Sequence, residues 1–137
     1  MAQINAYLHF NGNCREAMTF YQECLGGELT MQTVAETPTA SQMPPEAQQQ
    51  IMHANLTRGG LTLMASDMMR EAPLHGNTIS LMLYCSSEEE IDRCFASLSA
   101  GGTVNFPLTQ QFWGAVYGEL TDQFGLNWML NFDKPQA

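Results

Sequence analysis

Apolar and polar residues alternate strictly near the end of the chain. One set of alternate positions contains the apolar residues Leu126, Trp128, Leu130 and Phe132, and the other set contains Asn127, Met129, Asn131 and Asp133. A period of two predicts a strand at 126–132 with one apolar face and one face rich in amides. The amide face is either simply solvated or the wall of a ligand site, and periodicity alone leaves both interpretations open.

The rest of the pattern predicts two helices and seven further strands. Helices are expected at 14–25 and 87–99, where apolar residues recur at helical spacing and a Gly-Gly pair follows. Asn13 with Glu16, and Ser87 with Glu90, have the spacing of N-terminal capping boxes. The further strands are expected at 4–10, 28–33, 51–57, 61–66, 78–85, 103–108 and 115–121.

Both halves of the chain repeat the order strand, helix, strand, strand, strand. We therefore expect one α+β domain spanning 1–137, built from two βαβββ modules at 4–66 and 77–133. Residues 34–50 are rich in Pro, Thr and Gln, and they are predicted to form an irregular, mobile flap. Residues 67–76, which include Met68 and Met69, are predicted to be a linker.

Composition narrows the function classes. The 137 residues are 45% hydrophobic and carry a net charge of −9, with five Lys and Arg in total. Because so few cations cannot form a phosphate-binding stripe, we expect no nucleic-acid partner. No apolar run is long enough to span a membrane, and the start lacks a signal-peptide pattern. The cysteines, Cys14, Cys24, Cys85 and Cys94, form no C-x-x-C pair and are predicted to be buried thiols of a cytoplasmic protein.

Several motifs resemble one known superfamily. They are Phe20-Tyr21, the Leu-Gly-Gly-Glu-Leu run at 25–29, His53-Ala-Asn55, Phe112-Trp113-Gly114, Tyr117-Gly118 and the segment 121–131. Together with two βαβββ modules, these motifs make the chain similar to the vicinal oxygen chelate superfamily, which includes glyoxalase I, extradiol dioxygenases and bleomycin-resistance proteins. The C-terminal motif resembles the PhnB-like branch. The resemblance covers nearly the whole chain and implies curved mixed sheets, one helix per module, a ligand cleft and a homodimer.

The resemblance also implies where a metal would bind. Enzymes of the superfamily place ligands on the first and last strands of both modules, which in this sequence falls near Ala6, Met64, Ser80 and Met129. Alanine and methionine give no hard ligand to a divalent metal, and serine is a poor one. We therefore expect no metal and no cofactor at these positions, which argues against lactoylglutathione lyase and extradiol dioxygenase activity.

The predicted ligand site lies on the amide side of the strand at 126–132. Its expected lining is Met64, Ser80, Asn127, Met129 and Asn131, with His53, Asn55, Trp113 and Glu119 near the rim. Tyr117 shares a strand face with Glu119, and we expect the two side chains to meet in a pocket. Thioether, amide and aromatic groups suit a small, mostly apolar molecule with one or two hydrogen-bonding groups. Three of these residues also have plainer interpretations. His53 is then a half-buried histidine hydrogen-bonded to a neighbour, Glu119 is solvated, and Trp113 packs in the core or in a dimer contact.

Two function classes remain open. In the first, a metal-free protein binds a small organic molecule in a cleft. In the alternative, the chain is an enzyme, either metal-dependent or an acid–base catalyst that uses His53 and Glu119. Some PhnB-like relatives carry a methyltransferase label, but we find no methyl-donor motif in this sequence. The residues leave the identity of the ligand, and catalysis itself, open.

Overall fold

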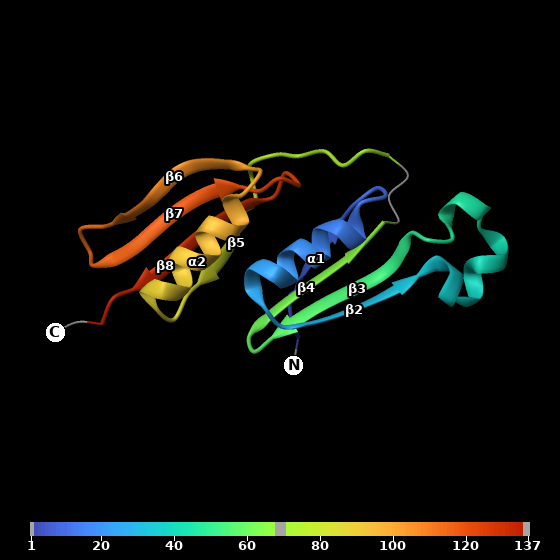
Figure 1. Ribbon diagram of the computed structural model, residues 1–137, viewed down its shortest axis with the longest axis horizontal. Coiled ribbons are helices and arrows are strands. Elements are labelled where there is room, and N and C mark those ends of the chain that lie inside the picture. The colour runs from blue at the N-terminus through green and yellow to red at the C-terminus, as the bar shows by residue number, and fades with distance from the viewer. Residues whose placement is uncertain (1, 68–70, 136–137) are drawn as a thin grey trace. The chain divides into compact units, whose positions relative to one another are not determined.

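The two predicted modules are present in the computed structural model, which describes residues 2–67 and 71–135 (Figure 1). The N-terminal module consists of β1 (Ala6–His9), α1 (Cys14–Leu25), β2 (Glu28–Thr33), β3 (Ile51–Arg58) and β4 (Leu61–Ser66). The C-terminal module consists of β5 (Leu81–Tyr84), α2 (Glu88–Ser99), β6 (Thr103–Gln110), β7 (Ala115–Thr121) and β8 (Asn127–Asp133). The chain divides into two compact units, Met1–Leu74 and His75–Ala137. Met68 and Met69 of the predicted linker lie outside the described residues.

Each module forms one four-stranded mixed sheet, and both sheets have the same topology. The strand order is β1-β4-β3-β2 in the first and β5-β8-β7-β6 in the second. The first and last strands of each module run parallel, and the other neighbours are antiparallel. Helix α1 packs on β2, β3 and β4, and α2 packs on β6, β7 and β8 (Figure 1). The α+β fold of two βαβββ modules that the sequence predicts is therefore confirmed.

Two strands start later than predicted. β1 starts at Ala6 rather than at residue 4, and β5 starts at Leu81 rather than at residue 78. Both are edge strands, and their pairing with the last strand of the module begins at Ala6 with Leu63 and at Leu81 with Trp128. Alternation along a sequence indicates a face, but the length of an edge strand is the length of its pairing, which here begins one or two residues after the partner strand has started.

The segment between β2 and β3 is more ordered than predicted. It contains three short 3₁₀ helices, η1 (Val34–Glu36), η2 (Pro38–Gln42) and η3 (Pro45–Ala47). The side-chain amide of Gln48 donates hydrogen bonds to the carbonyls of Ala40 and Met43 at 2.8 and 3.2 Å. The prediction of an irregular segment at 34–50 is therefore wrong, and its mobility stays a prediction.

Helix α1 begins with a cap that local sequence does not reveal. Asn13 makes no side-chain hydrogen bond to the helix. Instead, Oδ1 of Asp67 accepts from the backbone N–H groups of Gly12 and Cys14, both at 2.9 Å. Oδ2 of the same carboxylate accepts from the N–H of Ile51 at 2.9 Å, and Asp67 is buried. The prediction that Asn13 caps α1 is wrong, because a carboxylate that follows β4 holds these donors.

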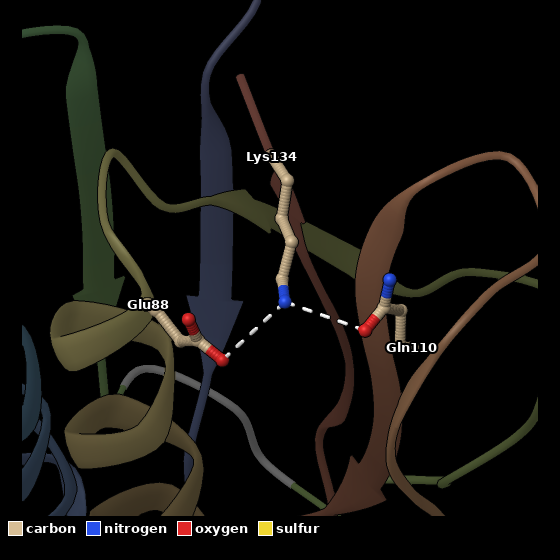
Figure 2. A network of polar contacts seen from close by, with 3 residues as sticks. All are labelled: Glu88, Gln110 and Lys134. Atoms are coloured by element: carbon tan, nitrogen blue, oxygen red, sulfur yellow. Dashed lines mark hydrogen bonds and ion pairs between the residues drawn. The ribbon is translucent and has the colours of Figure 1, made fainter. Parts of the chain in front are cut away.

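Helix α2 is capped by its own sequence, as predicted. Oγ of Ser87 accepts from the N–H of Glu90 at 3.0 Å, and the Glu90 carboxylate accepts from the N–H of Ser86 at 2.9 Å. Near this end of the helix, Nζ of Lys134 lies 3.8 Å from Glu88 and donates to the side-chain oxygen of Gln110 at 3.3 Å (Figure 2). Because these groups are solvated, the ion pair contributes little to stability.

Each helix buries its apolar stripe against its own sheet. The buried residues are Cys14, Ala17, Met18, Tyr21, Cys24 and Leu25 in α1, and Ile91, Cys94, Phe95 and Leu98 in α2. All four cysteines are buried free thiols, as predicted. Burial, and secondarily the negative charge of Asp67, raises the pKa of Cys14 to about 12. The Cys14 side chain therefore stays a neutral thiol at physiological pH.

The Gly-Gly pairs after the helices also allow a close backbone approach. A Cβ added to Gly27 would lie 2.6 Å from the carbonyl oxygen of Thr57 in β3. A Cβ added to Gly102 would lie 2.3 Å from the carbonyl oxygen of Thr121 in β7. Gly27 therefore lies against β3 and Gly102 lies against β7, and neither position has room for a side chain.

Candidate functional site

The alternation in β8 places the two faces of the C-terminal sheet as predicted. Trp128 and Leu130 are buried, at 3% and 0% exposure. Gly118 pairs with Leu130, and a Cβ added to it would lie 2.7 Å from the Phe95 ring of α2. Leu130 and Gly118 are therefore on the face that α2 covers. Because successive side chains of a strand point to opposite faces, their neighbours in β7 and β8 face away from the helix.

We call the face away from α2 the C-terminal open face, because no helix of its module covers it. It carries Met82, Tyr84, Phe106, Tyr117, Glu119, Met129 and Asn131. One row crosses all four strands, since Met82 pairs with Met129, Met129 with Glu119, and Glu119 with Phe106. Glu119 is therefore the acidic group of a row that is otherwise thioether and aromatic.

A hydrogen bond joins the two polar residues of β7 on this face. The Tyr117 hydroxyl donates to Oε2 of Glu119 at 2.9 Å, and both side chains are half-buried. Burial raises the pKa of Tyr117 to about 12, and the hydrogen bond to Glu119 and its negative charge add to the shift. Tyr117 therefore remains a hydrogen-bond donor throughout the neutral pH range. The predicted meeting of Tyr117 and Glu119 is confirmed.

The N-terminal sheet has an equivalent face away from α1, which we call the N-terminal open face. It carries Tyr7, His9, His53, Asn55 and Met64. Met64 lies in the middle, paired with Tyr7 on one side and Asn55 on the other. The Tyr7 ring centroid lies 5.2 Å from that of His9 and 6.1 Å from that of His53. His53, Asn55 and Met64, all predicted site residues, therefore share one face.

Asn55 has the most unusual environment on the N-terminal open face. Its Oδ1 is buried and has no hydrogen-bond partner in the structure. Its cross-strand neighbours are Met64 and Thr30. A buried acceptor without a donor costs about 1–3 kcal/mol, and native proteins keep few of them. This oxygen therefore has an unused acceptor capacity, which a bound molecule can satisfy only after displacing the side chains that cover the oxygen.

Two predicted site residues have partners within the C-terminal module. The Asn127 side chain donates to the carbonyl of Gly76 at 2.7 Å and accepts from the Thr121 hydroxyl at 3.0 Å, so it anchors the start of β8. The Asn131 side chain is 8% exposed and donates to Asp133 at 2.9 Å. Their amide groups are therefore already engaged by the chain.

Two further predicted residues lie away from the strands of the open faces. Ser80 is exposed and precedes β5. Trp113 lies in the β6–β7 loop, 55% exposed, with its ring centroid 4.9 Å from that of Phe112. Trp113 is therefore not a core residue of its module, so that one of its plainer interpretations is excluded.

The strand pairing also identifies residues that the sequence prediction missed. Tyr7, rather than Ala6, lies beside Met64, and Met82, rather than Ser80, lies beside Met129. The alternation of Tyr7 and His9 around buried Leu8 carried a usable signal for Tyr7. Phe106 gave no such signal, because the β6–β7 register shifts on both sides of it.

The described residues contain neither a metal-binding cluster of side chains nor a helix that could span a membrane. Within residues 2–67 and 71–135, no three side chains of His, Cys, Asp or Glu come close enough together to hold a metal ion. Neither helix in the described part of the chain is long and apolar enough to cross a membrane.

Comparison with known proteins gives the family of the chain. The family model described as 3-demethylubiquinone-9 3-methyltransferase matches residues 2–131. Protein YjdN of Escherichia coli is 34% identical over an alignment of 145 residues, which covers 97% of each chain. Protein PA1353 of Pseudomonas aeruginosa is 40% identical, with a TM-score of 0.85 over 98% of this chain and 100% of the other.

More distant structures share the fold. A Bacillus cereus protein, described as a putative 3-demethylubiquinone-9 3-methyltransferase and PhnB protein, is 26% identical with a TM-score of 0.76, over 96% of this chain and 99% of the other. A glyoxalase/bleomycin resistance protein/dioxygenase family enzyme of Burkholderia phytofirmans is 14% identical with a TM-score of 0.60, over 94% and 98%. The chain therefore belongs to the family described as 3-demethylubiquinone-9 3-methyltransferase, a PhnB-like family with the vicinal oxygen chelate fold.

Proposed function

We propose that the chain binds a small, mostly apolar organic molecule on the open faces of its sheets, without a resident metal. The observation that carries the proposal is the buried, unpartnered Oδ1 of Asn55 on the N-terminal open face. A ligand N–H or O–H group that reaches this oxygen removes the cost of leaving it unpaired. The half-buried Met64 beside it offers an adaptable apolar surface for the rest of the molecule.

The donor groups at the metal positions of the superfamily support the metal-free part of the proposal. By strand pairing, the open-face residues on the first and last strands of the two modules are Tyr7 and Met64, and Met82 and Met129. Three of these four are thioethers, which are soft ligands, whereas the hard divalent metals prefer imidazole, carboxylate or water. The residues present therefore do not fit the metal centre that the fold implies, and we assign the chain no step that uses one.

A thermal-shift screen of the purified chain against a library of small organic molecules tests the proposal. A ligand of the native state raises the apparent stability by mass action, by about 2.7 kcal/mol at a hundred times its Kd. We expect Asn55→Leu to weaken binding of the best compound by about 1–3 kcal/mol while the fold is kept, because the acceptor is lost. S-adenosylmethionine, included as the donor that a methyltransferase would need, is expected to give no shift.

The control for this screen is Asn11→Leu, which makes the same substitution at an exposed position before α1. This variant should bind the selected compound as the unmodified chain does. Equal affinity of Asn55→Leu and Asn11→Leu, or a library without a single stabilising compound, would count against the proposal.

We also propose that the chain is a homodimer. Several large apolar side chains outside the sheets are exposed, among them Ile79 at 76%, Phe112 at 97% and Trp113 at 55%. Phe112 and Trp113 lie together in the β6–β7 loop, with ring centroids 4.9 Å apart, and clusters of exposed apolar side chains mark protein–protein contacts. Sedimentation equilibrium at micromolar concentration should give the mass of two 15.2 kDa chains. A mass of one chain under these conditions would contradict the proposal.

A further inference from the structure

We propose that the C-terminal open face binds an organic cation, an amine or quaternary ammonium group attached to an apolar body. This inference rests on the proposed function and names the class of molecule that one of its faces takes. It follows from the chemistry around Glu119, which lies in the row of Met82, Met129 and Phe106 across the sheet.

Glu119 carries a negative charge, and the structure shows no contact between it and a described Lys or Arg of its own module. Its Oε2 accepts a hydrogen bond from the neutral Tyr117 hydroxyl at 2.9 Å. The Lys and Arg residues of 75–137 are Arg93 and Lys134. Arg93 lies on α2, which covers the other face of the sheet, and Lys134 contacts Glu88 and Gln110 (Figure 2). A half-buried carboxylate without a cation loses hydration and gains no charge partner, so a bound cation is favoured there.

The neighbours of Glu119 also suit a cation with an apolar body. Phe106 lies directly across from Glu119, and its ring centroid is 6.1 Å from that of Tyr117, with 59° between the planes. Two rings at this spacing and tilt can both present their electron-rich faces to one cation, the arrangement used to bind quaternary ammonium groups. On the other side of Glu119, Met129 and Met82 supply a flexible apolar surface.

Other ligand classes fit this face less well. An anion would meet the Glu119 carboxylate, and the net charge of −9 adds to the repulsion. A metal ion would need two or more further hard donors, and the neighbours of Glu119 in its row are thioethers and an aromatic ring. A neutral apolar molecule would contact Phe106 and Met82 but would leave the carboxylate desolvated and unpaired.

The test uses the full chain and a pair of probes of one shape. Benzyltrimethylammonium is the cation, and neopentylbenzene is its uncharged counterpart. Binding is followed by NMR of methionines labelled with ¹³C in the methyl group, with the Met82 and Met129 signals assigned from Met→Leu variants. We expect the cation to shift these two signals and to bind at least tenfold more tightly than neopentylbenzene.

Three variants separate the roles of the neighbouring groups. Glu119→Gln keeps the shape and should weaken binding of the cation about tenfold or more, because a contact with a charged partner is lost. Phe106→Leu keeps the apolar surface and should weaken it about threefold, from the loss of one ring. The control Glu89→Gln removes the same charge from the exposed start of α2 and should leave the affinity unchanged.

The outcomes distinguish this inference from the proposed function. Equal affinity for the two probes at Met82 and Met129, or equal losses in Glu119→Gln and Glu89→Gln, overturns the cation preference but leaves a face that binds small molecules. Probes that leave both methionine signals unshifted overturn the inference as well. The proposed function is then judged separately, by the library screen and the Asn55→Leu variant.

Discussion

Replacing Asp67 with alanine should lower the free energy of unfolding of the N-terminal module by about 3–5 kcal/mol. The carboxylate accepts hydrogen bonds from Gly12, Cys14 and Ile51, all at 2.9 Å, and it is 3% exposed. Alanine leaves these three N–H groups without an acceptor inside the protein, and it also removes a negative charge from the positive end of α1. Two separate segments, the start of α1 and the start of β3, lose their connection at once.

Urea denaturation measures the total effect, and amide hydrogen exchange shows which module opens. Exchange should accelerate most in α1 and β3, whereas β7 and β8 should change little. Asp92→Ala is the matched control, because Asp92 is an exposed aspartate on α2 and the structure shows no hydrogen bond for its side chain. If Asp67→Ala and Asp92→Ala were to unfold at the same urea concentration, the carboxylate would not hold the module together.

Replacing Asp122 with alanine should destabilise the C-terminal module by a similar amount, about 3–5 kcal/mol. Oδ1 of this buried carboxylate accepts from the N–H groups of Phe124 and Leu126 at 2.8 and 3.1 Å. Oδ2 accepts from the indole N–H of Trp128 at 2.8 Å, and Trp128 is 3% exposed. The substitution therefore removes the hydrogen-bond acceptor of the buried Trp128 side chain, together with two hydrogen bonds that stabilise the turn between β7 and β8.

The NMR signal of the Trp128 indole N–H gives a local measurement of this effect. In the unmodified chain it should exchange slowly with solvent, and in Asp122→Ala it should shift and exchange faster, together with a lower urea midpoint. Trp128→Phe should recover part of the loss in the Asp122→Ala background, because no indole N–H is then left unpaired. Purely additive effects of the two substitutions would show that the hydrogen bond contributes nothing.

Local periodicity was enough to predict the elements and the two faces of the last strand. The alternation around Trp128 and Leu130 reflects a direct physical demand, since apolar side chains of a strand must all reach the same buried side. It therefore placed Met129 and Asn131 on the opposite face without any knowledge of the partner strands. The capping pair of Ser87 and Glu90 was likewise predictable, because both members lie within one turn of the helix.

Long-range hydrogen bonds lie beyond such local patterns. Asn13 had the spacing of a cap, but Asp67, 53 residues beyond Cys14, holds the end of α1. Asp67 itself looked like the first residue of a polar linker, because burial of a carboxylate depends on donors that come from other segments. The same limit applies to Ser80, whose alternation with Met82 begins before Leu81, the first residue of β5 that pairs with β8.

The candidate site was predictable only where its contacts follow from alternation along a single strand. Tyr117 and Glu119 are two positions apart on one strand, so their contact follows from parity alone. That Asn131 is engaged by Asp133, while Asn55 lacks a partner at its oxygen, depends on side-chain geometry that spacing does not contain. Phe106 reaches Glu119 only because of shifts in the β6–β7 register, which no alternation pattern indicates.

The parallel pairing of β1 with β4 has a consequence for synthesis on the ribosome. β1 emerges first, but its partner is the last strand of the module, and Asp67 follows that strand. Helix α1 and the β2–β3 pair can form earlier, whereas β1 stays unpaired until β4 arrives. An unpaired strand and an uncovered helix face are the features that make partly folded chains aggregate. A pause in translation just before β4 would therefore prolong the state in which β1 has no partner strand.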